Sequence, residues 1–251
     1  MRSLRFVAGI AVLSLTAALP AQAVSTITRT RVSSSSIAFT TAPPESTLAG
    51  KFFTVAGTIS PARSRMTIIQ EKIGGKWLNM GRVQASSNGS FSRTVRLTKA
   101  GLHNLRAYSP ANSQFGAATS EVIEVSTLAK FWLKDTNSSA RFNGVTYAHS
   151  YSWSLYNIGA SSTDWDLQRK CTLLSLTVGI ADDARSGSAG RFEIYVDDAL
   201  EFSKTVAFGE SQEATIDLTG GLRLRVDVIK TSSTGTGMVI GDPQITCMPL
   251  A

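Results

Sequence analysis

Few side chains in this chain of 251 residues are placed to do covalent chemistry. Its two histidines, His103 and His149, stand in no nucleophile or metal motif. It has no Gly-x-Ser-x-Gly, no His-Glu-x-x-His and no glycine-rich phosphate loop. A pair of carboxylates for hydrolysis converges only in three dimensions, so it leaves no local pattern to find. We therefore expect a protein that is not an enzyme and that needs no cofactor.

Groups suited to non-covalent recognition gather in the second half of the chain. Aromatic rings offer faces for stacking, while carboxylates and guanidinium groups bond hydroxyls. The candidates of this kind are His149, Trp153, Trp165, Asp182, Asp183, Arg185 and Asp242. Several have a structural alternative, because Trp153 and Trp165 could fill a core. Asp182-Asp183 precedes a Gly/Ser-rich stretch and could shape a turn or supply oxygen ligands to a structural Ca²⁺.

The first 23 residues have the composition of a secretory signal peptide. Arg2 and Arg5 form a positive n-region, and Phe6 to Leu19 is an apolar run of about 14 residues. That run is shorter than the ~20 residues of a transmembrane helix, and no later stretch is long enough. Ala21-Gln22-Ala23 gives the small-x-small pattern of a cleavage site. We therefore expect a secreted, extracellular protein without a transmembrane segment.

The remaining chain indicates an all-β protein with one disulfide. Ser, Thr, Gly, Val and Ile are abundant, and turn signals recur every ~8–12 residues, as expected for short strands. The only two cysteines are Cys171 and Cys247. An even number of cysteines in an exported chain predicts that they pair.

Charge divides the chain into two parts. Residues 24–127 hold twelve Lys or Arg against four Glu, a net charge of +8, whereas residues 128–251 have a net charge of −3. This asymmetry indicates two domains with different partners. Nucleic acid is a poor partner for an exported chain. Anionic cell-envelope polymers suit the basic domain better, which suggests association with the cell wall, although a solvated basic surface would look the same.

Residues 48–127 read as about seven short strands that follow a Ser/Thr-rich arm or first strand at residues 24–47. Their stretch "GTISPARSRMTIIQEKIGGKWLNMGRVQASSNGSFSRTVRLTKAGLHNLRAY" resembles the bacterial immunoglobulin-like repeats of actinobacterial surface proteins. The resemblance implies an immunoglobulin-like sandwich in which Trp77 is a core residue. We expect His103, which lies beside Gly101, to be exposed in a turn.

Residues 128–251 show strict alternation of apolar and polar residues in three segments, which predicts strands with one buried face. The pattern "FWLKD … FNGVTYAHSYSW … VGIADDA … GRFEIYVDD … LRLRVDV … GDPQITC" resembles the NPCBM family of carbohydrate-binding modules. The resemblance covers nearly all of residues 130–248. It implies a jelly-roll, galactose-binding-like sandwich, so that the whole protein would be two β-sandwiches in series.

This resemblance implies that the seven candidate residues bind terminal sugars of glycans, with galactose-type sugars as the expectation. The sequence departs from the family pattern at three places. The Tyr-Gly-His spacing around Gly144 differs, Asp197-Asp198-Ala199 replaces an Asp-Gly hairpin, and residues 237–240 replace a loop bearing His or Trp. The alternative is therefore a structural or protein-interaction protein whose second sandwich has lost its sugar site.

The signal sequence gives a first prediction, that export removes residues 1–23. The intact mass of the protein recovered outside the cell should correspond to a chain that begins at Val24. Material that retains Met1 would contradict the assignment.

Overall fold

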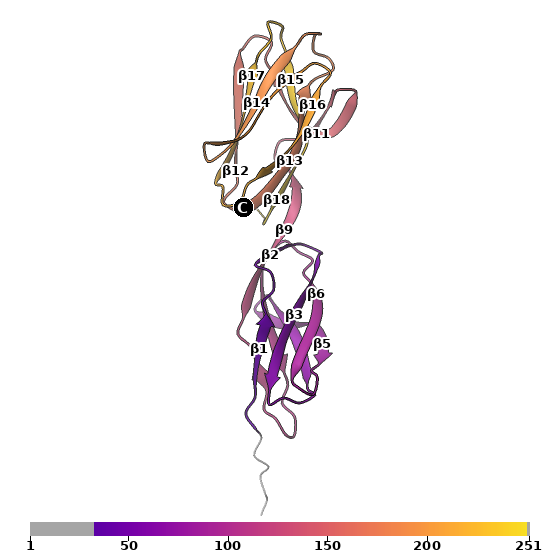
Figure 1. Cartoon of the computed structure of the whole chain (residues 1–251), viewed down its shortest axis with the longest axis vertical. Coiled ribbons are helices and arrows are strands. Elements are labelled where there is room, and N and C mark those ends of the chain that lie inside the picture. The colour runs from indigo at the N-terminus through magenta and orange to yellow at the C-terminus, as the bar shows by residue number, and fades with distance from the viewer. Residues whose placement is uncertain (1–32, 250–251) are drawn as a thin grey trace, which may run out of the picture.

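The computed structural model describes residues 33–249, and the signal peptide and cleavage site lie outside them. The described chain forms eighteen strands and no helix, which confirms the all-β prediction. It therefore contains no helix long and apolar enough to cross a membrane between residues 33 and 249. Figure 1 shows two bodies of strands joined end to end, which we call the N-terminal and the C-terminal unit.

The N-terminal unit consists of two sheets that enclose an apolar core. One sheet pairs β1 (Ser36–Thr41), β3 (Phe52–Ser60) and β6 (Ser90–Arg96). The other pairs β5 (Lys76–Gln84), β4 (Met66–Ile73), β7 (Gly101–Ser109) and β9 (Ile123–Trp132), with β2 (Ser46–Leu48) and β8 (Ala118–Thr119) at its margins. Val55, Ile69 and Phe91 meet in the core between the sheets. The segment that the sequence left open as an arm or a first strand thus contains β1 and β2.

The C-terminal unit also has two sheets. One follows the order β12 (Ala160–Asp166), β17 (Arg223–Lys230), β14 (Ala189–Val196) and β15 (Ala199–Ala207). The other contains β10 (Ser138–Phe142), β11 (Val145–Ser154), β18 (Gly237–Cys247), β13 (Cys171–Ile180) and β16 (Ser211–Asp217). β13 is one of the segments in which apolar and polar residues alternate, and its alternating apolar residues Leu174, Leu176, Val178 and Ile180 are all buried, as the alternation predicts.

A single strand, β9, belongs to both units. Its first half pairs with β7, from Ile123–Leu105 to Thr127–Gly101. Its second half pairs with β18, from Ala129–Cys247 to Trp132–Gln244. The boundary expected between residues 127 and 128 therefore falls inside a continuous strand rather than in a linker.

His103 is not exposed as expected. It lies within β7 and is only 9% exposed. Its Nδ1 is 2.6 Å from Glu71 Oε1, and its Nε2 lies 2.9 Å from the carbonyl oxygen of Lys99 and 3.0 Å from Thr127 Oγ1. The expectation failed because Gly101 starts a strand, and alternation then turns residue 103 toward the interior. Trp77 is half-buried under the Arg106 guanidinium, whose carbon lies 4.1 Å from the ring centroid.

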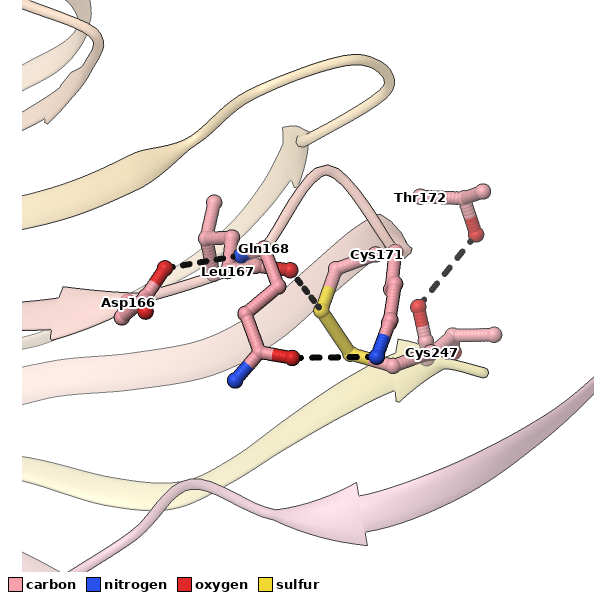
Figure 2. Close-up of a disulfide and its surroundings, with 8 residues drawn as sticks. Asp166, Leu167, Gln168, Cys171, Thr172 and Cys247 are labelled. Atoms are coloured by element: carbon pink, nitrogen blue, oxygen red, sulfur yellow. Dashed lines mark hydrogen bonds between the residues drawn. A yellow bond between two sulfur atoms is a disulfide. The ribbon is translucent and has the colours of Figure 1, made fainter. Parts of the chain in front are cut away.

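The predicted disulfide joins Cys171 and Cys247 with an S–S distance of 2.05 Å. It connects the first residue of β13 to the last residue of β18, and both sulfurs are buried (Figure 2). Cys247 also pairs with Ala129 of β9. The cross-link therefore lies where the two units meet.

We predict that replacing both cysteines by serine lowers the free energy of unfolding of the C-terminal unit by roughly 2–5 kcal/mol. The reason is that the bond closes a loop with a sequence separation of 76 residues and so restricts the unfolded chain. Calorimetry of the unaltered protein and of the serine variant should show two transitions, of which only that of the C-terminal unit shifts, and reductant should shift it in the unaltered protein alone. Equal melting of the C-terminal unit in both proteins would contradict the prediction.

Candidate functional site

The two tryptophans among the sequence-derived candidates are core residues. Trp153 is 5% exposed and Trp165 is 7% exposed. The indole N–H of Trp153 donates to Thr163 Oγ1 at 3.0 Å, and that of Trp165 donates to the carbonyl oxygen of Lys134 at 3.1 Å. Of the two roles that the sequence left open, the structure shows the core role, and neither ring presents a free face to solvent.

Asp182 and Asp183 border a hollow of about 700 Å³ that we call the distal groove. It lies at the end of the C-terminal unit away from β9, and the largely buried Trp153 is also among its lining residues. Tyr156 is 46% exposed there, and its ring packs so closely on Gly235 that an added Cβ would lie 2.3 Å from Tyr156 Cδ1.

Most of the segment from residue 149 to residue 166, which holds His149, Trp153 and Trp165, is strand. Only residues 155–159 connect β11 to β12. That connection and the loop after Ile180 lie at the same end of the unit, and both contribute to the distal groove. Arg185 is exposed in the second loop and does not line the groove.

The residues at Asp182 do not fit a calcium ion. Its carboxylate lies 3.2 Å from Arg141 Nε and accepts the N–H of Gly144 at 3.2 Å. Its negative charge is therefore matched by a guanidinium. Between residues 33 and 249, no three His, Cys, Asp or Glu side chains come close enough together to hold a metal.

The last two candidates, His149 and Asp242, lie at the point where three strands meet. β11 pairs with β18 up to Gly241, and β9 pairs with the same edge of β18 from Gln244 onward. The pairing of β11 with β18 therefore stops at Gly241 and that of β9 starts at Gln244, on either side of Asp242 and Pro243. His149 from β11 and Trp132 from β9 stack there, with ring centroids 3.9 Å apart and planes 18° apart.

A β-bulge turns Asp242 outward beside this stack. The register between β13 and β18 shifts between Ser175, opposite Gln244, and Thr177, opposite Gly241. Asp242 has φ 43°, in the left-handed region that few residues other than Gly, Asn and Asp adopt. Its Oδ1 accepts the backbone N–H of His149 at 3.0 Å. Bulges of this kind re-aim side chains and are frequent next to binding sites.

The exposed part of Trp132 borders a hollow of about 280 Å³ on the outer face of β13, β16 and β18. Trp132 is 43% exposed. The other polar residues that line the hollow are Ser175, Thr177, Glu213, Thr215, Asp242 and Gln244. Apart from Asp242, none of these side chains bonds another residue of the described chain, so their hydroxyl, amide and carboxylate groups face solvent. We call this hollow, with Trp132 and His149, the Trp132 platform.

His149 carries a further sign of a binding site. Its Nδ1 is buried and has no hydrogen-bond partner among the described residues. A buried polar atom without a hydrogen-bond partner costs free energy. A binding site can keep such an atom when a ligand or a water molecule supplies the missing hydrogen bond.

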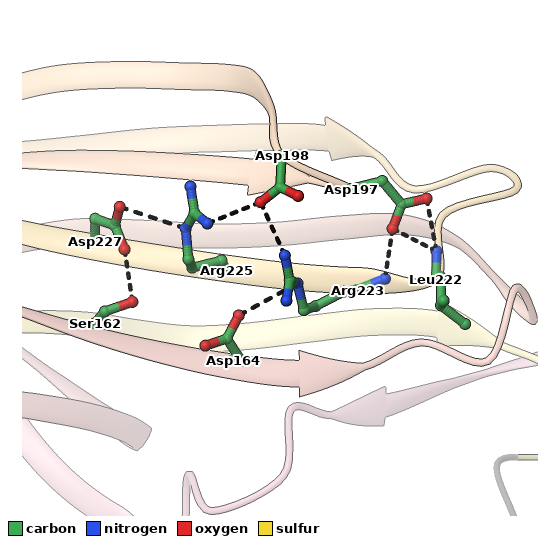
Figure 3. A network of polar contacts seen from close by, with 8 residues as sticks. All are labelled: Ser162, Asp164, Asp197, Asp198, Leu222, Arg223, Arg225 and Asp227. Atoms are coloured by element: carbon green, nitrogen blue, oxygen red, sulfur yellow. Dashed lines mark hydrogen bonds and ion pairs between the residues drawn. The ribbon is translucent and has the colours of Figure 1, made fainter.

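The outer face of the opposite sheet contrasts with the platform, because its charges already neutralise each other. Arg223 and Arg225 both contact Asp198 Oδ1 at 2.8 Å (Figure 3). Arg223 Nε also lies 3.6 Å from Asp164, and Arg225 Nε lies 3.4 Å from Asp227. Within this network each arginine is matched by at least one carboxylate.

The turn beside that network has Asp197-Asp198 where the NPCBM pattern has Asp-Gly, and its conformation explains how the chain tolerates this difference. Both residues are left-handed, with φ 47° and 68°, as a two-residue hairpin requires. The Asp197 carboxylate accepts the N–H groups of Leu222 and Arg223, and these hydrogen bonds lower the pKa of Asp197. The two aspartates therefore have a structural role in this turn.

Sequence reasoning included His149 and Asp242 but missed Trp132, although it lies in the Phe-Trp-Leu-Lys-Asp run. Nothing local marks Trp132, because its role depends on β9 and β11 meeting at β18. The polar lining from β13 and β16 was equally hidden, since those residues alternate with core residues as on any sheet.

A comparison with known protein families concerns the part of the chain that holds this platform. Residues 118–242 match the NPCBM/NEW2 domain family. The match begins in β8 of the N-terminal unit and ends at Asp242 of the bulge. The match supports carbohydrate binding by the matched residues, which include Trp132, His149 and Asp242.

No curated protein matches the chain. Solved structures with partial similarity include a Clostridium perfringens ZmpB fragment with CBM51-2 and INT domains, at 14% identity and a TM-score of 0.38. That alignment covers 60% of this chain and 38% of the other, so the chain spans well under half of that structure. CBM51 from Clostridium perfringens GH95, in complex with methyl-galactose, is 16% identical with a TM-score of 0.35 over 43% of this chain and 78% of that one.

Proposed function

We propose that this is a secreted, non-catalytic protein that binds the terminal sugars of glycans through the Trp132 platform. The observation that carries the proposal is the exposed Trp132 ring, which His149 supports at 3.9 Å next to a hollow of unengaged polar groups. The match of residues 118–242 to the NPCBM/NEW2 family supports the same class of ligand.

The platform offers the two kinds of contact that a sugar ring needs. An indole face packs on the C–H groups of a pyranose, while hydroxyl, amide and carboxylate groups bond its hydroxyls. A galactose-type ring, whose axial 4-hydroxyl leaves a continuous patch of C–H groups on one face, suits a single flat aromatic ring. Galactose-type terminal sugars are therefore the ligands that we propose.

The ring of Trp132 is held in place before any ligand arrives. Its stacking on His149 and the hydrogen bond from the His149 backbone to Asp242 fix the three residues relative to one another. A site that is rigid in advance loses less conformational entropy when it binds.

We predict that Trp132→Ala weakens binding of galactose- or N-acetylgalactosamine-terminated glycans by about thirtyfold, or ~2 kcal/mol, as expected for a central aromatic contact. His149→Ala should weaken binding less, because it removes only the support of the ring. Calorimetry of the exported chain measures both. Trp77→Ala is the matched control, since it makes the same substitution in the N-terminal unit and should leave the affinity unchanged.

Asp183→Ala tests the distal groove in the same experiment. Loss of binding with Asp183→Ala but not with Trp132→Ala would move the sugar site to that groove. If no glycan binds the unaltered protein on an array, the structural or protein-interaction role replaces the proposal.

We further propose that the N-terminal unit associates with anionic cell-envelope polymers. Among the described residues up to 127, no Lys or Arg takes part in an ion pair, and the ion pair there joins His103 to Glu71. By contrast, four arginines of the C-terminal unit are matched by carboxylates: Arg141, Arg191, Arg223 and Arg225. Unpaired surface cations attract polyanions without regard to their sequence.

Such attraction is screened over a Debye length of about 8–10 Å near physiological salt, so binding to purified cell wall should fall steeply as salt rises. Replacing Arg82 and Lys99 with Gln should weaken it, whereas replacing Lys134 and Lys204 in the C-terminal unit should have little effect. Sedimentation of the protein with cell wall measures both. Binding that does not depend on salt would show that the charge is incidental.

A further inference from the structure

A separate hollow of about 530 Å³ lies at the end of the N-terminal unit that is remote from the C-terminal unit. β7 starts at Gly101, which pairs with Thr127 next to the junction, and ends at Ser109, close to the connection that holds Asn112, Gln114 and Phe115. The groups that matter belong to three connections between strands: Arg63 and Arg65, Ser87, and Asn112, Gln114 and Phe115. No carboxylate lines it.

Arg65 is the unusual residue of this hollow, because its guanidinium is buried without an anionic partner. Arg65 is 3% exposed. Its Nη1 donates to Ser35 Oγ at 2.8 Å and its Nη2 donates to the carbonyl oxygen of Gly116 at 2.9 Å. Its Nε is buried and bonds no residue of the described chain.

A buried charge of this kind costs free energy unless another charge compensates it. The ring of Phe115, whose centroid is 5.0 Å from the guanidinium carbon, offers only partial compensation. Burial also lowers the pKa of Arg65, which is a further sign that the positive charge is held in an unfavourable place. An anion in the hollow would restore the balance.

The other lining residues present donors at the mouth of the hollow. Arg63 is exposed and forms no ion pair within the described chain. The side-chain oxygen of Asn112 accepts the N–H groups of Gln114 and Phe115, which leaves its amide N–H₂ free to donate. Ser87 and Gln114 add a hydroxyl and a second amide.

We propose that this hollow is a binding site for an oxyanion of the phosphate or sulfate type. A tetrahedral oxyanion accepts hydrogen bonds on three or four oxygens and so can use donors that come from several sides, whereas a carboxylate has two oxygens. Arg63 would pair with it directly, and the buried charge of Arg65 would attract it through a medium that screens little. The site is independent of glycan binding, and it deepens the proposed attraction to envelope polymers by naming one pocket for their charged groups.

The test is a titration of the exported chain with sodium sulfate and sodium phosphate, followed by NMR of the arginine Nε–Hε and backbone signals. Sodium chloride and sodium acetate at matched ionic strength are the controls. We expect saturable shifts that centre on residues 63–65 and 112–115 with sulfate and phosphate only. Shifts that stay linear, or equal saturation with acetate, would overturn the proposal.

Three variants locate the site. Arg63→Gln should weaken sulfate binding about tenfold, the usual effect of losing a charged hydrogen bond. Ser87→Ala should weaken it less, and neither substitution disturbs a buried group. Arg82→Gln is the matched control, because it removes the same charge from an exposed position on β5 outside the hollow.

An equal loss of sulfate affinity with Arg63→Gln and Arg82→Gln would show a general charge effect and would contradict the proposed site. Failure of the envelope proposal looks different, since binding to cell wall would then be absent while sulfate still saturates the hollow. Arg65→Met adds a check on the buried charge, with circular dichroism to confirm that the variant folds; a folded Arg65→Met protein with unchanged sulfate affinity would also contradict the proposal.

Discussion

The edge of β18 must be hydrogen-bonded along its length, and the chain meets this requirement with strands from two different units. Backbone N–H and C=O groups at a buried sheet edge need partners, because water cannot supply them there. β11 covers the edge from Gly237 to Gly241, and β9 covers it from Gln244 to Cys247. Because β9 also completes the second sheet of the N-terminal unit, one strand ties both units together.

The other features at the junction follow from this arrangement. Two strands that share one edge leave a break between them, and the chain spans it with the bulge at Asp242 and the hydrogen bond from Leu133 N–H to the carbonyl oxygen of Pro243, 2.9 Å long. The same break brings together Trp132, the last residue of β9, and His149, which lies next to the last residue of β11 that pairs with β18. Cys171–Cys247 then fixes the end of β18 to β13. The platform is therefore a consequence of how the sheet edge is satisfied.

Sequence patterns predicted the features that depend on neighbours along the chain. Alternation identified the buried face of β13, and the cysteine count identified the disulfide. Neither pattern could predict the position of Trp132, because the end of β9 becomes part of a site only by pairing with β18, more than a hundred residues away in sequence. His103 was misplaced for a similar reason: a glycine beside it indicated a turn, but the partners that hold it, Glu71 and Thr127, are distant in the chain.

The two units differ in how their charges are used, and this difference suits two different kinds of recognition. Arg141, Arg191, Arg223 and Arg225 of the C-terminal unit are paired with carboxylates, and the proposed platform offers stacking and hydrogen bonds, which act at short range. The cations of the N-terminal unit form no ion pairs in the described chain and attract anions at long range, where salt weakens the attraction.

Because β9 joins the units without a flexible linker, a contact made by one unit holds the other at a fixed orientation to the same surface. Two weak contacts that are geometrically coupled in this way raise each other's effective concentration, provided that the surface presents both ligands at the matching spacing. Under the two proposals made above, the continuous strand would make the spacing of sugars and anionic groups on the target part of its recognition.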